Sequence, residues 1–333
     1  MPADDPGGAG AVGIRPMDRA DIPAVVRLIN AADAVDQADE GTSEAEFRHW
    51  VEQSGGPGNR VVALNAPGEI VGYGDVYHQP GDEGAWGWVV VHPAWRRHGI
   101  GMRLAGQVLD RARRLGVAWI DYATDVRLHE ANAWLARLGY EPVRTYMRLR
   151  LPPDVVVPAP GYPAGFHTRT FHPGEDVASV RAILTAPFAD HRNAHAVDAG
   201  ADGATADLGQ PWFDPRGLCV VETDEGQIVG LCWSYIDHDE NRRRGEAIGW
   251  INDLEVARAY RRQGLGRALL LDGIHWLRGQ GMRTVDLWVD SGNREARNLY
   301  AAAGFQVDKS VVDYRHFLRA GRPAPPLANP PSR

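Results

Sequence analysis

The chain has 333 residues, of which 44% are hydrophobic, and its 43 acidic residues outnumber its 36 basic ones to give a net charge of −7. At about 150 residues per domain this length predicts two globular domains, and the acidic balance argues against nucleic acid as a partner. No apolar run approaches the roughly 20 residues that span a bilayer, and the first 13 residues do not resemble a signal peptide. We therefore expect a cytoplasmic protein without a membrane partner.

The first half of the chain alternates short apolar runs with amphipathic stretches, which predicts a sheet flanked by helices. It follows a start at 1–12 that we expect to be disordered. The predicted elements are a strand at 13–17, a helix with Ile22 to Ile29 on its apolar face, a helix opened by the capping-box pair Ser43 and Glu46, a hairpin of 60–66 and 69–78 about Pro67-Gly68, a strand at 86–92, a helix at 102–115, a strand at 118–124, a helix ending near Leu138 and a strand at 140–151.

The second half repeats this order after a linker at 152–164, whose five prolines predict a stiff, extended segment. Its predicted elements are a strand at 166–170, a helix at 175–186, a long polar segment at 189–214, a hairpin at 218–236, a strand at 246–256, a helix at 267–279, a strand at 283–289, a helix at 294–303 and a strand at 305–318. The two domains are therefore expected at 13–151 and 165–320, with a disordered tail at 321–333. The polar segment is either a lid or substrate wall or a disordered loop.

The two cysteines, Cys219 and Cys232, fall on the two arms of the second hairpin. A turn at Asp224-Glu225-Gly226 would place them opposite one another, and we expect reduced, packed thiols there. No Cys/His spacing typical of zinc occurs, so no metal is expected.

The most informative feature is a glycine loop that occurs twice. Arg96-Arg97-His98-Gly99-Ile100-Gly101 and Arg261-Arg262-Gln263-Gly264-Leu265-Gly266 lie 165 positions apart. The same offset relates Val91 to Val256, Gly116 to Gly281, Asp121 to Asp286, Asp125 to Asp290, and Gly139-Tyr140 to Gly304-Phe305. A repeat of this length indicates a duplicated domain.

Each loop follows an apolar strand and opens a helix, so its peptide N–H groups and the helix dipole favour a phosphate. A P-loop would need Lys-Ser/Thr after its last glycine, where Arg267-Ala268 stands. A dinucleotide fingerprint would need a third glycine at Leu269. The loop fits neither pattern.

Arg-x-x-Gly-x-Gly after an apolar strand, followed by Asn293, Tyr300 and Gly304-Phe305, resembles the GNAT superfamily of acetyl-CoA-dependent N-acetyltransferases. The resemblance covers nearly the whole chain as two copies. It implies an α/β (α+β) fold of two tandem GNAT-like domains, each a mixed, mostly antiparallel sheet that splays between its fourth and fifth strands and is flanked by helices. It also implies acetyl-CoA as the acetyl donor.

The resemblance places the cofactor-binding and catalytic residues by position. In the second copy the backbone of the strand would pair with the pantetheine amides, the loop would wrap the phosphates, the asparagines would contact the cofactor arm, and Tyr300 would act as general acid toward the leaving thiolate. The cofactor residues implied are Leu254, Glu255, Val256, Arg261, Arg262, Gln263, Gly264, Leu265, Gly266, Arg267, Asn293, Asn298 and Tyr300, with Val89, Val90, Val91, Arg96, Arg97, His98, Gly99, Ile100, Gly101 and Met102 in the first copy. For Asn293 a helix N-cap is an alternative that can coexist with this role.

The two copies differ at the reactive end. Leu135 stands where the second copy has Tyr300, and Leu128 stands where it has Asn293. Tyr122 could supply a phenol, but its place on a strand favours packing. We therefore expect turnover in the second copy, with the first either binding acetyl-CoA or serving only as structure.

A tandem chain with one degenerate copy also resembles the mycothiol synthases, which acetylate the cysteine amine of a glucosamine–inositol conjugate. One departure is Trp250, which stands where such enzymes often have a glutamate base. Asp253 and Glu255, on one strand face, are the alternative bases, with Asp290 close by. The departure favours acetylation of another small-molecule primary amine over mycothiol synthesis itself.

The alternatives are a protein or peptide acetyltransferase and a non-catalytic acetyl-CoA sensor. The acidic run Asp237 to Glu240 could attract a cationic acceptor, although such a run is more often a solvated turn. The sequence leaves the acceptor and the oligomeric state open.

Overall fold

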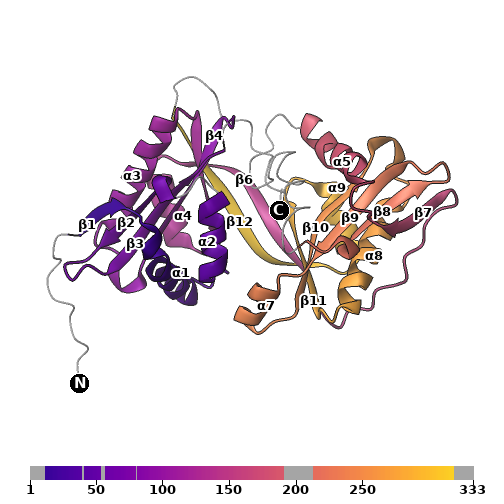
Figure 1. Cartoon of the computed structure of the whole chain (residues 1–333), viewed down its shortest axis with the longest axis horizontal. Coiled ribbons are helices and arrows are strands. Elements are labelled where there is room, and N and C mark those ends of the chain that lie inside the picture. The colour runs from indigo at the N-terminus through magenta and orange to yellow at the C-terminus, as the bar shows by residue number, and fades with distance from the viewer. Residues whose placement is uncertain (1–11, 40, 54–56, 80, 191–212, 319–333) are drawn as a thin grey trace, which may run out of the picture. The chain divides into compact units, whose positions relative to one another are not determined.

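The computed structural model describes residues 12–39, 41–53, 57–79, 81–190 and 213–318. These residues form two compact units (Figure 1). Unit 1 contains the chain up to Thr145 and again from Ser310, and unit 2 contains Tyr146–Lys309. The expectations for 1–11, 319–333 and most of the polar segment at 189–214 fall outside the described residues.

Unit 1 is a sheet covered by helices on both faces. Its strands lie in the order β1-β2-β3-β4-β5-β12. Its elements are β1 (Gly13–Pro16), α1 (Ile22–Asp36), α2 (Glu44–Gln53), β2 (Arg60–Leu64), β3 (Ile70–Tyr77), β4 (Gly84–Val91), α3 (Ile100–Leu115), β5 (Trp119–Asp125), α4 (His129–Arg137), the start of β6 (Glu141–Leu151) and most of β12 (Gln306–Phe317). Helices α1 and α2 pack with Val90 of β4, whereas α3 packs with Val89 and Val91, so the alternation along one strand separates the two cores.

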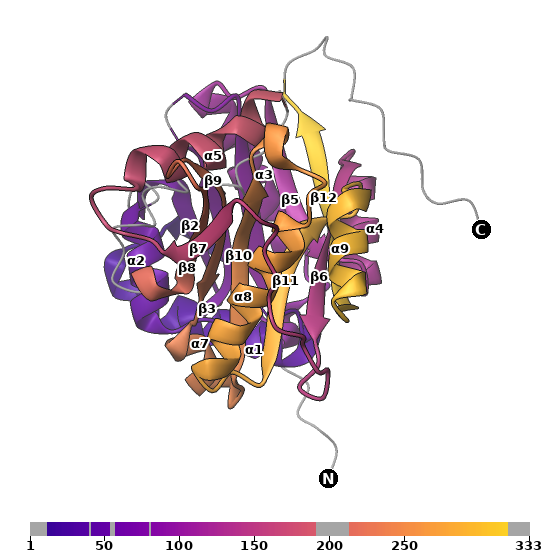
Figure 2. The ribbon, with the colours of Figure 1, turned by 90° about the vertical axis from the view of Figure 1, so that its right-hand side faces the viewer.

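Unit 2 has the same plan, with strands in the order β6-β11-β10-β9-β8-β7. Its further elements are β7 (Phe166–Thr170), α5 (Val177–Asp190), β8 (Leu218–Thr223), β9 (Ile228–Tyr235), α7 (His238–Arg244), β10 (Ile248–Val256), α8 (Leu265–Gly279), β11 (Thr284–Asp290) and α9 (Arg294–Ala302). Figure 2 looks onto α8 and α9, which share one apolar core with β10 and β11, while α5 packs against β8 and β9 in a separate core.

Both sheets splay between their two parallel strands. Strand β10 pairs with β11 only from Ile248 to Ile251, and β4 pairs with β5 only from Gly84 to Trp86. Beyond these points each strand continues to its loop paired on one side only. The predicted splayed, mixed sheet in two tandem copies is thus confirmed.

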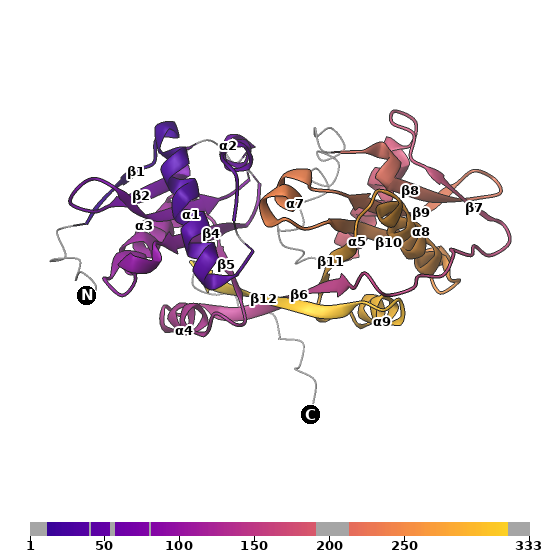
Figure 3. The ribbon, with the colours of Figure 1, turned by 90° about the horizontal axis from the view of Figure 1, so that it is seen from below.

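The last strand of each sequence repeat lies in the compact unit of the other repeat. Strand β6 pairs antiparallel with β11 in unit 2, and β12 pairs antiparallel with β5 in unit 1 (Figure 3). On each of these exchanged strands an arginine side chain binds a buried aspartate of the neighbouring strand. Arg150 binds Asp286 with contacts of 2.7 and 2.8 Å, and Arg315 binds Asp121 at the same two distances. Each compact unit therefore differs from its sequence repeat in its last strand, which comes from the other repeat.

Several local predictions are confirmed. Ser43 and Glu46 form the reciprocal capping box, and Cys219 lies in register with Cys232, both as free thiols. The proline-rich stretch before β7 forms no helix or strand, but it is held against α8, since Arg278 donates to the carbonyls of Pro152 and Pro153. Among the described residues no helix has both the length and the apolarity to cross a membrane.

The acidic run was expected to be a solvated turn or an attractor for cations, and it instead begins helix α7, which the sequence analysis missed. Asp237 caps the helix by accepting from the N–H of Glu240. Asp239 and Glu240 pair with Arg242 and Arg244 one turn later. These carboxylates are therefore matched by cations on their own helix.

Candidate active site

The glycine loop of unit 2 leaves the start of α8 open to a ligand. Gly264 is the N-cap residue, with φ +92°, a conformation that favours glycine, and Arg262 has φ +67°. Within the described chain no side chain caps this helix. The first-turn N–H groups of α8 therefore remain available for a phosphate, as the helix dipole favours.

The loop of unit 1 repeats this geometry in detail. Gly99 has φ +77° and Arg97 has φ +68°. In both loops the first arginine returns to its own strand, since Arg96 Nε donates to the carbonyl of Val91 and Arg261 Nε to that of Val256. The loops differ in the partner of the first arginine, since the Arg96 guanidinium is bound at both ends by Asp36, at 2.7 Å each.

The splay makes one edge of β10 available to a ligand. Leu254, Glu255 and Val256 pair with β9 on one side, and their register with β11 has already ended at Ile251. Unpaired strand backbone beside a phosphate loop is a suitable partner for the two amides of a pantetheine arm. The residues present therefore fit acetyl-CoA as a substrate.

A β-bulge at Asn252 sets which side chains face the reactive end. The register of β10 with β9 shifts between Ile251 and Asp253. Because of this shift Trp250, Asp253 and Glu255 share one face of the sheet, whereas Leu254 and Val256 pack into the core beneath α8. The two candidate carboxylates thus share one strand face, as their spacing predicts, and the structure places that face opposite α8.

Glu255 has the electrostatics of a general base. Burial first and the nearby charge of Asp253 second raise its pKa to about 7, and Arg261 opposes the shift. Its side chain keeps 31% of its surface exposed, and one oxygen lies 3.9 Å from the Arg261 guanidinium. A carboxylate with a pKa near neutral pH can both accept a proton from an amine and release it again.

Tyr300 of helix α9 lies in the apolar core that α8 covers, and the charge of Glu255 acts on its phenol. It is 8% exposed and packs against Phe305, with ring centroids 5.8 Å apart. Burial raises the pKa of its phenol above the usual value, and the charges of Cys232, Glu255 and Asp253 raise it more. Tyr300 therefore stays protonated and can donate a proton or a hydrogen bond.

Two further predicted residues, Asn293 and Asn298, belong to α9 or its N-terminus. Asn293 is the N-cap of α9, because its side-chain oxygen accepts from the N–H of Ala296 at 3.1 Å. Asn298 lies exposed on the same helix. Asp290, the third carboxylate considered, accepts from the N–H of Gly292 in the turn that leads to α9.

The corresponding place in unit 1 is built differently. Strand β4 has no bulge in its pairing with β3, and Val90 and Trp88 stand where unit 2 has Glu255 and Asp253. Helix α2 packs aromatic rings on this face, where Phe47, Trp50, Tyr73 and Trp88 form ring contacts with centroids 5.6 to 5.9 Å apart.

The inner end of the unit 1 splay is filled as well. Tyr122 is 5% exposed, and its ring lies so close to Gly87 that a Cβ there would meet it at 2.5 Å. The interpretation of Tyr122 as a packing residue is confirmed. At the positions of Glu255 and Tyr300, unit 1 therefore has Val90 and Leu135, and neither side chain can transfer a proton.

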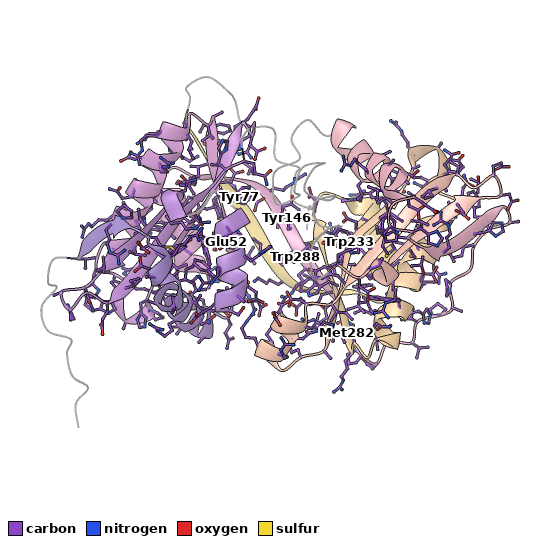
Figure 4. The ribbon with its side chains drawn as sticks, in the orientation of Figure 1. Glu52, Tyr77, Tyr146, Trp233, Met282 and Trp288 are labelled. Atoms are coloured by element: carbon purple, nitrogen blue, oxygen red, sulfur yellow. The ribbon has the colours of Figure 1, made fainter. Side chains whose placement is uncertain are left out.

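Sequence reasoning missed two aromatic residues on the Glu255 face. Trp288 of β11 is 42% exposed although its strand is otherwise buried, and Tyr146 of β6 lies on the neighbouring strand (Figure 4). Alternation along β11 could have placed Trp288 on this face. Tyr146 comes from the exchanged strand, so no pattern within the second repeat could have indicated it.

Comparison with known proteins agrees with this geometry. Residues 24–140 and 177–305 each match the Acetyltransferase (GNAT) family. The chain belongs to this family, and it is an N-acetyltransferase with two tandem GNAT domains.

Two proteins named mycothiol acetyltransferase are similar to this chain along most of its length. The chain is 33% identical to a mycothiol acetyltransferase of Frankia alni, with 90% of this chain and 92% of that protein covered. It is 32% identical to another of Thermomonospora curvata, with 85% and 90% covered.

Two solved structures share the whole architecture. A GCN5-related N-acetyltransferase from Sphaerobacter thermophilus matches with a TM-score of 0.77 at 27% identity, covering 93% of this chain and 97% of that one. A tandem GNAT protein from the clavulanic acid biosynthesis pathway matches with a TM-score of 0.72 at 18% identity, covering 94% and 100%, which shows the fold alone.

Proposed function

We propose that the protein transfers the acetyl group of acetyl-CoA to the primary amine of a small molecule, and that unit 2 performs the chemistry. The observation that carries this proposal is the unpaired edge of β10 beside the open glycine loop, with Glu255 on that strand and its charge acting on the buried phenol of Tyr300. One group there has a pKa near 7 and the other stays protonated. Together they form a base and an acid at one end of a phosphate loop.

The transfer proceeds by direct attack. The amine nitrogen bonds to the thioester carbonyl carbon, its proton passes to the Glu255 carboxylate, and the C–S bond breaks. The sulfur receives a proton or a hydrogen bond from Tyr300. Holding both reactants in line is the largest contribution, worth up to roughly 7–11 kcal/mol where the geometry is good.

Unit 1 serves as a binding unit in this proposal. Its loop keeps the open helix start, which supports acetyl-CoA binding, but Val90 takes the place of Glu255, and the aromatic rings of α2 pack on the same face. The relatives named mycothiol acetyltransferase make the amine of the mycothiol precursor the first acceptor to test. Because Trp250 stands at the expected glutamate position, other small amines should be tested in the same assay.

The phenol gives the first test of this function. Tyr300→Phe should lower the rate of thiol release from acetyl-CoA in the presence of a productive amine by about 10²-fold, since it removes one positioned donor from the leaving sulfur. Tyr140→Phe makes the same chemical change in unit 1 and should leave the rate unchanged. If no amine in a broad library accelerates thiol release, a sensor role replaces catalysis. If only peptide amines accelerate thiol release, the proposal of a small-molecule acceptor is wrong.

Binding stoichiometry tests the roles of the two loops. We expect calorimetry to find two CoA sites, with Gly264→Glu removing one and Gly99→Glu the other, because each change places a carboxylate where a phosphate would lie. Apart from the adjacent backbone, no heavy atom of the described residues lies within 4 Å of a Cβ at either position. Gly226→Glu is the matched control, since Gly226 has φ +79° and equally open surroundings outside the loops. A single site that only Gly99→Glu removes would contradict the assignment of chemistry to unit 2.

A further inference from the structure

Unit 1 contains a basic pocket away from its glycine loop. It has a volume of about 200 Å³ and lies between the C-terminal half of α3 and the strands β1 and β2. The residues that line it are Ile14, Arg15, Pro16, Gly58, Asn59, Arg60, Val61, Gln107, Val108, Arg111 and Arg114. Four of them are arginines and none is acidic.

Two of these arginines already have carboxylate partners. Arg15 binds Asp21 at 2.6 and 2.8 Å, and the fully buried Arg60 lies 3.7 Å from Asp75. Their charges are therefore matched within the unit, and they contribute shape and hydrogen-bond donors more than net charge.

The other two have no carboxylate partner in the described parts of the chain. Arg111 Nε donates to the side-chain oxygen of Asn59 at 2.7 Å, which orients the guanidinium without neutralising it. Arg114 is exposed and forms no hydrogen bond or ion pair with the described residues. Gln107, Arg111 and Arg114 follow one another at spacings of four and three, so they lie on one face of α3.

We propose that this pocket binds a small organic anion that carries at least two negative charges. Two guanidiniums that meet no counterion among the described residues, one of them already oriented, favour bidentate contacts with carboxylate or phosphate groups. Ile14, Val61 and Val108 provide apolar walls for the carbon skeleton. A pocket of this size suits a di- or tricarboxylate or a phosphate monoester. The overall charge of −7 disfavours a long polyanion at this surface.

Calorimetry on the full chain with saturating CoA tests this site, because CoA occupies the glycine loops and so removes them as competing anion sites. Citrate and glycerol phosphate are the probes, and they separate a carboxylate ligand from a phosphate ligand. The wild type should bind at least one of them at millimolar concentration or below. Arg111→Gln with Arg114→Gln should weaken binding at least about tenfold, since two charge-assisted contacts are lost.

Arg113→Gln is the matched control. Arg113 lies on the same helix but pairs with Asp110 and does not line the pocket. It should leave the affinity unchanged, and thermal unfolding should show that all variants are folded. Equal affinity in the wild type and the double variant would overturn the proposal, as would binding of heparin alone or the absence of any binding at millimolar concentration. None of these outcomes bears on acetyl transfer, so the test of this pocket is independent of the proposed function.

Discussion

Replacing Glu255 with Gln is expected to lower the rate of acetyl transfer by about 10²- to 10⁴-fold, the usual contribution of a positioned general base. Gln keeps the size and the hydrogen-bond capacity of the side chain but cannot accept the proton of the amine. The measurement is thiol release from acetyl-CoA at saturating amine. The loss should appear in kcat more than in KM, because the carboxylate acts in the transition state.

The pH profile separates this role from a structural one. Because the pKa of Glu255 is raised to about 7, the wild-type rate should fall as the pH drops below 7 and the carboxylate becomes protonated. The Gln variant should lose this limb. Asp253→Asn should move the limb to lower pH, since the charge of Asp253 is one of the causes that raise the pKa. If Asp253→Asn causes the larger loss of rate, the base is Asp253.

Stability should change in the opposite direction to activity. The pKa of Glu255 in the folded protein lies above its ordinary value of 4.5, so folding favours the protonated carboxyl. Stability is therefore lost as the pH rises from about 4.5 through 7, where the folded state must give up this proton. At pH 8 the Gln variant should unfold at the same or a higher temperature than the wild type. A lower unfolding temperature would mean that the rate loss reflects damage to the fold.

Most of the fold follows from local patterns in the sequence. The glycine loops, the capping box at Ser43 and the hairpins depend on short-range chemistry, and the structure has them within a few residues of the predicted bounds. The bulge at Asn252 follows less directly, because it is visible only in the register of β10 against β9. It nevertheless decides that Glu255 shares a face with Trp250, and it explains why counting from the glycine loop alone does not settle the base.

The strand exchange could not be predicted, because the repeat is symmetric. Arg150 and Arg315 are equivalent in the two copies, as are Asp121 and Asp286. A sequence with this offset is equally consistent with each arginine binding the aspartate of its own copy or that of the other. Chain connectivity and packing decide between the two, and neither leaves a mark in composition or periodicity. The aromatic Tyr146 reaches the Glu255 face for the same reason.

Breaking the exchanged ion pair should cost about 3–5 kcal/mol of unfolding free energy, since removal of one partner leaves a buried charge uncompensated. Arg315 and Asp121 are the cleaner pair for this test, with side chains 3% and 2% exposed. Arg315→Met should therefore destabilise the protein by a large fraction of the 5–15 kcal/mol typical of a domain. Denaturant unfolding followed by tryptophan fluorescence measures the change.

A second substitution identifies the partner. Adding Asp121→Leu to Arg315→Met should recover most of the lost stability, because it removes the unpaired carboxylate. Recovery should be incomplete, since Arg315 also lies 4.5 Å above the ring of Trp119 and that contact is lost with it. Adding Asp286→Leu should recover no stability. Asp286 is the partner of Arg150, so its removal would leave the Arg150 guanidinium unpaired as well. Recovery by Asp286→Leu instead of Asp121→Leu would mean that each arginine binds within its own repeat, and that the two GNAT copies fold without exchanging their last strands.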